Sequence, residues 1–366
     1  MKNTNSTKDN TKQIQVSFAA LNPFIETNIV SPEEKAVSGK DFIQWGDNNL
    51  YPNYLCGLYK DVTVLRTIIN GIADYVVGDG VSTSLNYTPE EIEDIVRLLA
   101  QDYALYGGIA LDVERSIEDK VAKAYHLDFK SLRSDKKGDF FYYSSDWKKS
   151  AGRVNYTTYS KFRTDGKEKS SIYYFKNTAN QTYPTPLIAG DGLIAAETIK
   201  SISQYHLNSI KNGFSGNYVM NFNNGVPSDA QKEELEEMFY DKFVGENNAG
   251  RPMLSFNNGD KQAVTVTKID SDNFADKYAA LRDSSRQTIF TAFRANPNLF
   301  GIPTENNGFS NEEYMESFKL FNRTVIRPIQ KIICNAFDRV FQTSNSVTIK
   351  PFNIDWEDDT QETVVQ

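Results

Sequence analysis

The strongest structural signal in this sequence is a stripe of apolar residues that begins at Tyr314 and ends at Val340. Its members recur at steps of three and four residues, which is the spacing of one face of an α-helix. Ser310 and Glu313 form a capping box just before the stripe, so the helix is expected to begin there. A helix of about thirty residues with one apolar face needs other segments to cover that face. The stripe consists of Tyr314, Phe318, Phe321, Val325, Ile329, Ile332, Ala336 and Val340.

A proline interrupts this helix. Pro328 lies well inside the stripe, where it removes a backbone donor and clashes with the preceding turn. We therefore expect one long helix that is kinked at Pro328. A last strand, in the segment SVTIKPFNIDW, is expected after it.

Two more helices are predicted in the first third of the chain. One is expected from Asp61, with Leu65, Ile68, Ile69 and Ile72 on one face. The other opens at Thr88, because Pro89 suits the first helical position and Glu91 completes a capping box. The segment before them, FIQWGDNNLYPNYL, is rich in Gly, Asp, Asn and Pro and is interpreted as turns between apolar residues.

The pattern changes to short strands between residues 107 and 186. These runs alternate with polar turns, which is typical of a sheet. We expect a β domain of meandering strands, with the runs IALDVE, AYHLDF, DFFYYS, RVNYTTYS and SSIYYFK.

A compact insert follows between two long helices. The helices are expected at Leu193 to Lys211 and at Asp270 to Arg294. The insert, from Phe214 to Thr267, has the order strand (NYVMNF), helix (Ser228 to Phe243), strand (RPMLSF) and strand (AVTVTKI). Together these patterns predict an α+β fold.

Composition supports a chain that is mostly folded. Apolar residues make up 39% and charged residues 24% of its 366 positions, so only the ends are expected to be disordered. Residues 1–40 are predicted to be a disordered or extended arm, and residues 357–366 a disordered acidic tail. The sequence contains no apolar run long enough to span a membrane and no secretory signal, and Cys56 and Cys334 lack CxxC spacing. We expect a soluble, cytoplasmic protein with reduced thiols.

No catalytic constellation is recognisable. His126 and His206 are the two histidines, and each is interpreted as structural. Metal-binding motifs and the phosphate loop are absent, and the GDG at residues 78–80 is a turn rather than a dinucleotide fingerprint. The acids of EELEE lie beside Leu235, Met238 and Phe239, so they are expected on the exposed side of a helix. We expect no enzyme activity, no metal and no cofactor.

The segment from Gly192 to Phe341 resembles the portal proteins of long-tailed phages. The resemblance rests on the order helix, insert, helix (YAALRDSSRQTIFTAF), polar loop (NPNLFGIPTENNGFSNEE) and helix (FKLFNRTVIRPIQKIICNAF). The WGDNNLYP opening of the first half is similar only loosely.

The resemblance implies names for the parts. Residues 191–213 and 268–295 would be the stem helices, residues 214–267 a small αβ clip, and residues 296–310 the tunnel loop. Residues 41–190 and 311–356 would be a β-rich wing that carries the long kinked helix. Little of the chain follows that helix, so the crown domain of the family is expected to be minimal or absent.

The resemblance also implies site residues. Candidates for the DNA channel are Glu305, Asn306 and Asn307, with Arg282 and Arg286 on one face of the preceding helix, although an intersubunit salt-bridge face is the favoured reading of the two arginines. Candidates for docking of partners are Glu233, Glu236 and Glu237. Candidates for packing in a ring are Phe318, Phe321, Val325, Pro328 and Ile329.

The implied function is that of a ring, usually of twelve subunits, which conducts double-stranded DNA at one capsid vertex during packaging and ejection. Implied partners are the packaging ATPase (terminase), the head-tail adaptor and the capsid protein, with assembly in the host cytoplasm and a final place in the virion. A net charge of −8 argues against a tight grip on DNA but suits a wall past which DNA slides. Two alternatives stay open: another virion structural protein, such as an adaptor or capsid subunit, and a phage hydrolase that uses carboxylates.

Overall fold

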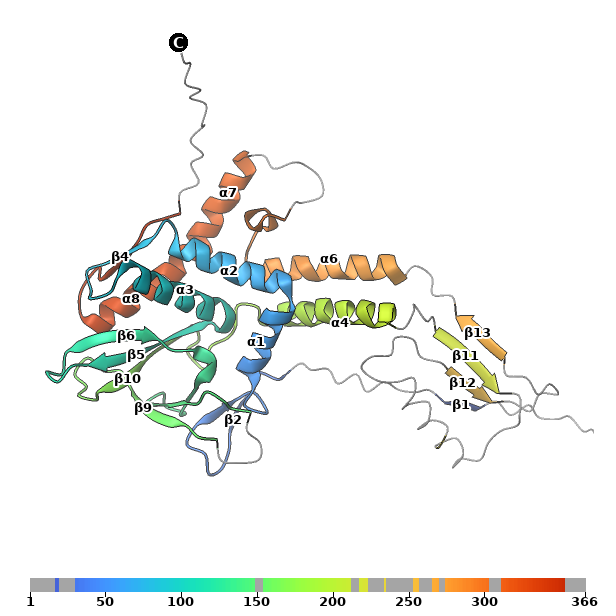
Figure 1. Ribbon diagram of the computed structural model, residues 1–366, viewed down its shortest axis with the longest axis horizontal. Coiled ribbons are helices and arrows are strands. Elements are labelled where there is room, and N and C mark those ends of the chain that lie inside the picture. The colour runs from blue at the N-terminus through green and yellow to red at the C-terminus, as the bar shows by residue number, and fades with distance from the viewer. Residues whose placement is uncertain are drawn as a thin grey trace, which may run out of the picture. The chain divides into compact units, whose positions relative to one another are not determined.

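The computed structural model describes residues 17–19, 30–148, 154–211, 217–222, 234, 253–256, 265–269, 274–302 and 311–352. The chain divides into two compact units, and each is described by itself. The smaller unit consists of Met1–Thr27 and Lys200–Arg282, and the larger unit of Asn28–Ile199 and Asp283–Gln366. The boundary falls within two helices, α4 (Asp191–Lys211) and α6 (Phe274–Ala292). Figure 1 shows the elements of both units.

The larger unit contains the helices α1 (Tyr51–Asp61), α2 (Thr63–Val77), α3 (Pro89–Tyr106), α7 (Asn311–Phe321) and α8 (Arg327–Phe341). Of these, α3 and α8 pack against the main sheet. In Figure 1, α2, α3 and α8 lie on one side of the sheet. The predicted capping box of α3 is confirmed, because the Thr88 hydroxyl accepts from the Glu91 N–H and the Glu91 carboxylate accepts from the Thr88 N–H.

The first helix of the larger unit was not predicted. The sequence reading placed turns up to residue 55 and a helix from Asp61, whereas α1 already begins at Tyr51 and α2 starts at Thr63. Pro52 stands in the first turn of α1, where its missing N–H costs nothing. The predicted apolar face of α2 is confirmed, since Leu65, Ile68, Ile69 and Ile72 are all buried.

The main sheet has six strands in the order β6-β5-β10-β9-β8-β7. The five predicted strand runs all contain strands, but the expected simple meander is wrong. β10 pairs parallel with β9, the strand before it in sequence, and antiparallel over seven residues with β5, which lies far from it in sequence. Bounds are β5 (Gly108–Arg115), β6 (Val121–His126), β7 (Leu132–Ser134), β8 (Phe140–Tyr143), β9 (Thr157–Lys161) and β10 (Ser170–Lys176).

The larger unit also contains two small two-stranded ladders. β2 (Glu34–Ala36) pairs with β3 (Ile43–Trp45), and β4 (Val81–Thr83) pairs with the last strand, β14 (Val347–Ile349). β2 belongs to the segment that was predicted to be a disordered or extended arm, and it is a paired strand. The β4–β14 ladder joins segments more than 260 residues apart, as the bond from Thr83 Oγ1 to the Ser346 carbonyl also does.

The long C-terminal helix is continuous from Asn311 to Phe341 but changes its hydrogen-bond pattern midway. Residues Asn322–Ile326 form a π-helical turn, in which the Arg327 N–H bonds to the Asn322 carbonyl oxygen. Figure 1 shows α7 and α8 running in different directions. The irregularity thus precedes Pro328 instead of centring on it. Proline has no N–H to donate to the carbonyl four residues earlier, and its ring clashes with that carbonyl in a regular α-helix. The wider π-helical turn gives the ring room.

The WGDNN segment connects β3 to the main sheet through buried hydrogen bonds. Asn49 has φ of 63°, and its side-chain oxygen accepts hydrogen bonds from the Trp45 N–H at 3.1 Å and from Arg133 Nε at 2.6 Å. Arg133 is fully buried and has the ring of Trp147 beneath it, 4.7 Å from the guanidinium carbon. Burial lowers the pKa of Arg133 to about 10. Gly46 is required here, because its φ is 84° and a Cβ would lie 2.8 Å from the Ser31 carbonyl oxygen.

The smaller unit contains a four-stranded sheet of order β1-β12-β11-β13. Its strands are β1 (Ser17–Ala19), β11 (Asn217–Phe222), β12 (Met253–Phe256) and β13 (Thr265–Ile269). β1 comes from the predicted arm and pairs antiparallel with β12, so residues 17–19 are also part of a sheet. The three predicted strands of the insert are confirmed, whereas its helix, Ser228 to Phe243, lies outside the described residues except for Glu234.

Within the smaller unit, α4 and α6 contact each other through aromatic rings. Tyr205 and Tyr278 have centroids 5.1 Å apart, and the His206 ring lies 5.7 Å from that of Tyr278. The His206 side chain is otherwise exposed. The described residues include no helix that is both long and apolar enough to span a membrane. The α+β fold class is confirmed.

Candidate functional site

The structure describes residues 296–302, the first part of the predicted tunnel loop, and the helix α7 that follows the loop. Residues 303–310, which include Glu305, Asn306 and Asn307, lie outside the described residues, as does Ser310, the expected cap of the helix. Before them, α6 leads into a short 3-10 turn, η2 (Pro297–Phe300), and after them α7 begins at Asn311. The positions of these two flanks determine where the loop can start and end.

Asn296 joins the two flanks. Its side-chain oxygen accepts from the Asn298 N–H at 3.1 Å and so caps η2, while its Nδ2 donates to the Ser317 hydroxyl on α7 at 2.8 Å. η2 ends at Gly301, which has φ of 72°. The sequence NPNLFG therefore forms a fixed turn against α7, since asparagine is a good cap, proline suits a first turn and glycine suits a left-handed end.

An aromatic cluster lies under both flanks. Tyr75 from α2 contacts four other rings at centroid distances between 5.2 and 6.1 Å: Phe300, Phe318, Phe321 and Phe352. Phe300 lies so close to Gly71 that a Cβ there would be 2.6 Å from its ring. Aromatic pairs in such tilted and edge-on arrangements contribute about 0.5–1.5 kcal/mol each beyond burial. The cluster therefore fixes η2 and the last turn of α7 on α2.

The residues predicted to pack in a ring belong mainly to the core of this chain. Phe318, Phe321, Val325 and Ile329 are buried, and Pro328 is exposed. Exposed apolar side chains occur elsewhere, on the two long helices. On α4, Leu207 is 47% and Ile210 is 61% exposed, and on α6 Leu281 is exposed as well. Helical spacing gave no signal for this exposure, because Ile210 is in line with the buried Ile199 and Ile202 on the same helical face.

The two arginine candidates differ in their surroundings. Arg282 is exposed, while Arg286 is partly buried and forms an ion pair with Asp283 at 3.3 Å. The pair is local to one helix, because it joins residues three positions apart. The three docking candidates, Glu233, Glu236 and Glu237, lie outside the described residues.

The histidine of the sheet has a buried carboxylate partner. His126 Nε2 lies 2.8 Å from an Asp102 carboxylate oxygen, which also accepts from the Phe129 N–H at 3.2 Å. Burial raises the pKa of Asp102, and the hydrogen bond to His126 offsets part of that effect. This contact joins α3 to the sheet and its following turn. In the part of the chain that the structure describes, no group of three or more His, Cys, Asp or Glu residues could hold a metal ion.

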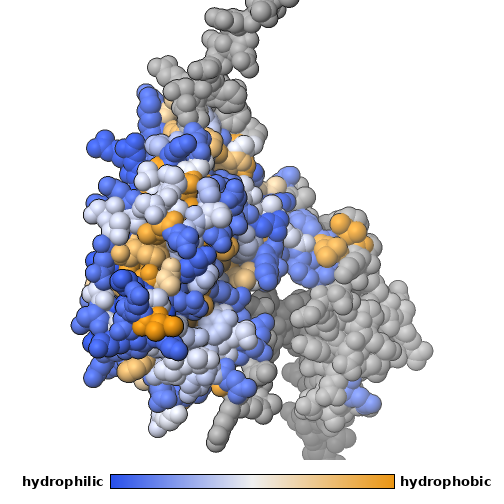
Figure 2. All heavy atoms as spheres, turned by 60° about the vertical axis from the view of Figure 1, so that its left-hand side comes forward, coloured by the Kyte–Doolittle hydropathy of each residue, from blue (hydrophilic) through white to orange (hydrophobic). Residues whose placement is uncertain are grey.

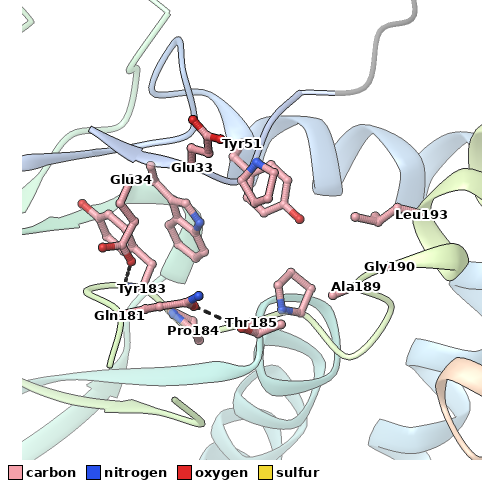
Figure 3. Close-up of a pocket in the computed structure, with 13 residues that line it drawn as sticks. Glu33, Glu34, Tyr51, Gln181, Tyr183, Pro184, Thr185, Ala189, Gly190 and Leu193 are labelled. Carbon is pink, nitrogen blue, oxygen red and sulfur yellow. Dashed lines mark hydrogen bonds between the residues drawn. The ribbon is translucent and has the colours of Figure 1, made fainter. Parts of the chain in front are cut away.

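A cavity of about 390 Å³ lies beside β2, β3 and the start of α4. Figure 3 shows Tyr51, Tyr183, Pro184 and Leu193 around it, with Glu33 and Glu34 at one side. Trp45 also lines it and stacks on Tyr183 with centroids 4.5 Å apart. The carboxylate of Glu34 already accepts two backbone hydrogen bonds, so the site offers apolar walls and few free polar groups.

Comparison with protein families shows to which family the chain belongs. The profile of the family described as phage portal protein matches residues 86–359, well over half of the chain. The chain belongs to the phage portal protein family. The matched range includes α3, the main sheet, both long helices and the kinked helix, so it extends the resemblance seen in the sequence into the first half.

The chain is also similar to other proteins in sequence and in fold. The chain is 33% identical over 130 residues to an uncharacterized protein of Rickettsia bellii (strain RML369-C), and 31% over 131 residues to one of Rickettsia felis (strain ATCC VR-1525 / URRWXCal2). Each match covers 35% of this chain and 32% of the relative, so the alignment spans about a third of their length. A chain in the neck of a native gene transfer agent particle, computed with C12 symmetry, has a similar fold, with a TM-score of 0.52 and 15% sequence identity. The superposition covers 83% of this chain and 85% of the other.

Proposed function

We propose that this chain is the subunit of a ring that conducts double-stranded DNA through one vertex of a phage capsid, during genome packaging and ejection. The observation that carries the proposal is the family match over residues 86–359. The ring would form in the host cytoplasm and become part of the virion. The protein would act as a conduit without enzyme activity or cofactor.

The parts of the chain fit that role as follows. α4 and α6 would be the stem, the four-stranded sheet with residues 214–267 the clip, and the main sheet with α7 and α8 the wing. Residues 296–310 would be the tunnel loop, and the Asn296 and Tyr75 contacts would fix its two ends. Glu305, Asn306 and Asn307, which carry no positive charge, would let DNA pass without binding it. Arg282 and Arg286 on α6 would be the cationic candidates for the channel.

A ring of twelve is the expected assembly. The similar fold in a neck computed with C12 symmetry supports this number. Exposed apolar residues on α4 and α6 support side-by-side contacts between copies, because such residues gain stability when a neighbour covers them. The face in Figure 2 is largely hydrophilic with separate apolar patches, which suits a subunit with limited contact areas. The packaging ATPase, the head-tail adaptor and the capsid protein would be the partners, with Glu233, Glu236 and Glu237 facing one of the first two.

Ring formation is the test. Purified protein should form rings with a central hole in negative-stain microscopy, and native mass spectrometry should give the copy number. Replacing Leu207 and Ile210 with Glu should prevent rings and leave the folded subunit intact, because both side chains are exposed in it. Ile117→Glu is the matched control, since Ile117 is fully exposed on the turn between β5 and β6. A wild-type protein that stays a compact monomer at all concentrations would contradict the proposal.

A further inference from the structure

A second cavity in the larger unit gathers positive charge. It has a volume of about 430 Å³, and four lysines line it: Lys136, Lys137, Lys161 and Lys176. The whole chain has a net charge of −8, so this concentration of cations is not a general property of its surface. One acid, Glu34, also lines the cavity.

The strand register brings these lysines to one edge of the main sheet. Lys161 and Lys176 end two parallel strands, β9 and β10. β8 runs antiparallel to β9, with Phe140 opposite Ser160, so the β7–β8 turn that carries Lys136 and Lys137 lies beyond the same end. Residues paired across neighbouring strands share a face of the sheet. By that rule Phe141, Lys161, Tyr174 and Lys176 lie on one face, and all four line the cavity.

The turn that carries two of the lysines is held in place. The carboxylate of Asp135 accepts hydrogen bonds from three N–H groups: Lys137 at 3.3 Å, Asp139 at 2.8 Å and Phe140 at 3.0 Å. Gly138 takes φ of 73° and closes the turn. The Lys161 N–H donates to the Asp139 carbonyl oxygen at 2.9 Å, which fixes the turn on β9. The backbone under the lysines is therefore preorganised.

The nearby acids are engaged elsewhere. Glu34 accepts from the N–H groups of Thr182 at 2.9 Å and Tyr183 at 2.7 Å. Asp139 lies 3.6 Å from Arg163. Among the ion pairs of the described residues, none includes a lysine of this cavity.

Two observations favour binding of an anion in this cavity. Burial lowers the pKa of Lys176, attraction to Glu34 offsets part of this, and repulsion from Lys161 adds to it. In addition, the phenol oxygen of Tyr174 is buried and has no hydrogen-bond partner within the described part of the chain. An anion in the cavity would relieve the repulsion between the lysines, and a buried donor without a partner is costly.

We propose that this cavity binds a multiply charged phosphate group, supplied either by a nucleic-acid backbone or by a free oligophosphate. Four ammonium groups exceed what one carboxylate can neutralise, whereas a phosphate chain offers several charged oxygens to several lysines. The site lies outside the parts assigned to the channel, and its binding does not require a ring. The proposal therefore goes beyond the conduit role and can succeed or fail independently of it.

The experiment compares two variants that lose the same number of charges. The site variant carries Lys136→Gln, Lys137→Gln, Lys161→Gln and Lys176→Gln. The control variant carries Lys60→Gln, Lys120→Gln, Lys319→Gln and Lys331→Gln, four exposed lysines that do not line the cavity. Calorimetry at low ionic strength measures binding of tripolyphosphate, and fluorescence anisotropy measures binding of a labelled DNA duplex. If the quadruple site variant does not fold, the Lys161→Gln, Lys176→Gln double variant replaces it.

Tripolyphosphate should bind the wild type and the control alike, and the site variant at least about tenfold more weakly. If the natural source is nucleic acid, duplex binding falls in the site variant alone and its salt dependence becomes less steep. If the source is a free oligophosphate, duplex binding is the same in both variants. The proposal is wrong if tripolyphosphate does not bind, if both variants lose it equally, or if a polyglutamate peptide of equal charge binds as tightly.

Discussion

The phenol of Tyr75 donates a hydrogen bond of 2.7 Å to the backbone carbonyl oxygen of Leu299, 224 residues further along the chain. The bond links α2 to η2, the turn in the first part of the predicted tunnel loop. Tyr75 also lies in the middle of the aromatic cluster under that loop. One side chain thus connects the start of the loop with the helix at its end.

We predict that Tyr75→Phe lowers the free energy of unfolding by about 1–2 kcal/mol. The ring contacts persist in this variant, but the Leu299 carbonyl loses its partner in a buried place. Urea denaturation followed by circular dichroism measures the change. Tyr125→Phe is the control, because Tyr125 is exposed, and it should stay within about 0.5 kcal/mol of wild type.

A neighbouring pair of positions on α7 tests how the long helix is packed. Phe321 is 2% exposed and Leu320 is 65% exposed, so the same substitution meets opposite surroundings. Phe321→Asp should abolish folding and with it ring formation, because it places an unpaired charge in an apolar core. Leu320→Asp should give folded protein with nearly wild-type stability. Soluble, cooperatively unfolding Phe321→Asp protein would show that the helix does not lie on this core.

Local sequence signals predicted the elements that depend on local chemistry. The α3 capping box needs only Thr88 and Glu91 to be three residues apart, and the apolar face of α2 needs only helical spacing. The sequence did not reveal α1 because Gly46, Asn48 and Asn49, just before it, are residues typical of turns. Pro52 was nevertheless a usable signal for a helix start.

Pairings between distant segments could not be predicted. Asn49 and Arg133 are 84 residues apart, and nothing near either one indicates that a buried guanidinium would meet an asparagine. The position of β10 between β5 and β9, and the pairing of β1 with β12, depend on tertiary packing in the same way. The four lysines of the second cavity are spread from Lys136 to Lys176, so only the register brings them together.

Acidic pH should destabilise the C-terminal part of the larger unit, because it protonates the Asp338 carboxylate. Burial acts to raise the pKa of this carboxylate, but the hydroxyl and N–H of Ser346 and the N–H of Asn345 donate to it, and together they hold its pKa below the usual 3.8. A depressed pKa means that the stabilisation is complete above pH 3.8 and is lost as the pH falls through the lower folded value. Asp338→Asn should lower stability at pH 7 by about 1 kcal/mol, and the gap to wild type should close in that acidic window. A gap that stays constant down to pH 2 would exclude this role.

The predicted acidic helix of the insert is the segment where partner binding and ring assembly can be separated most directly. Glu233, Glu236 and Glu237 accompany Leu235, Met238 and Phe239 in a run that Ser228 and Gln231 are expected to cap. If the apolar residues face the insert, the acids face outward, and charge of one sign on that side of the helix favours a basic partner. Reversing the three acids to Lys should leave rings intact and abolish co-elution with the packaging ATPase or the adaptor. The control reverses Asp94, Asp165 and Glu168, three exposed acids of the larger unit, which gives the same change in net charge. Rings of the first variant that still bind both partners would rule out the docking role, and loss of rings in that variant alone would assign these acids to contacts between subunits.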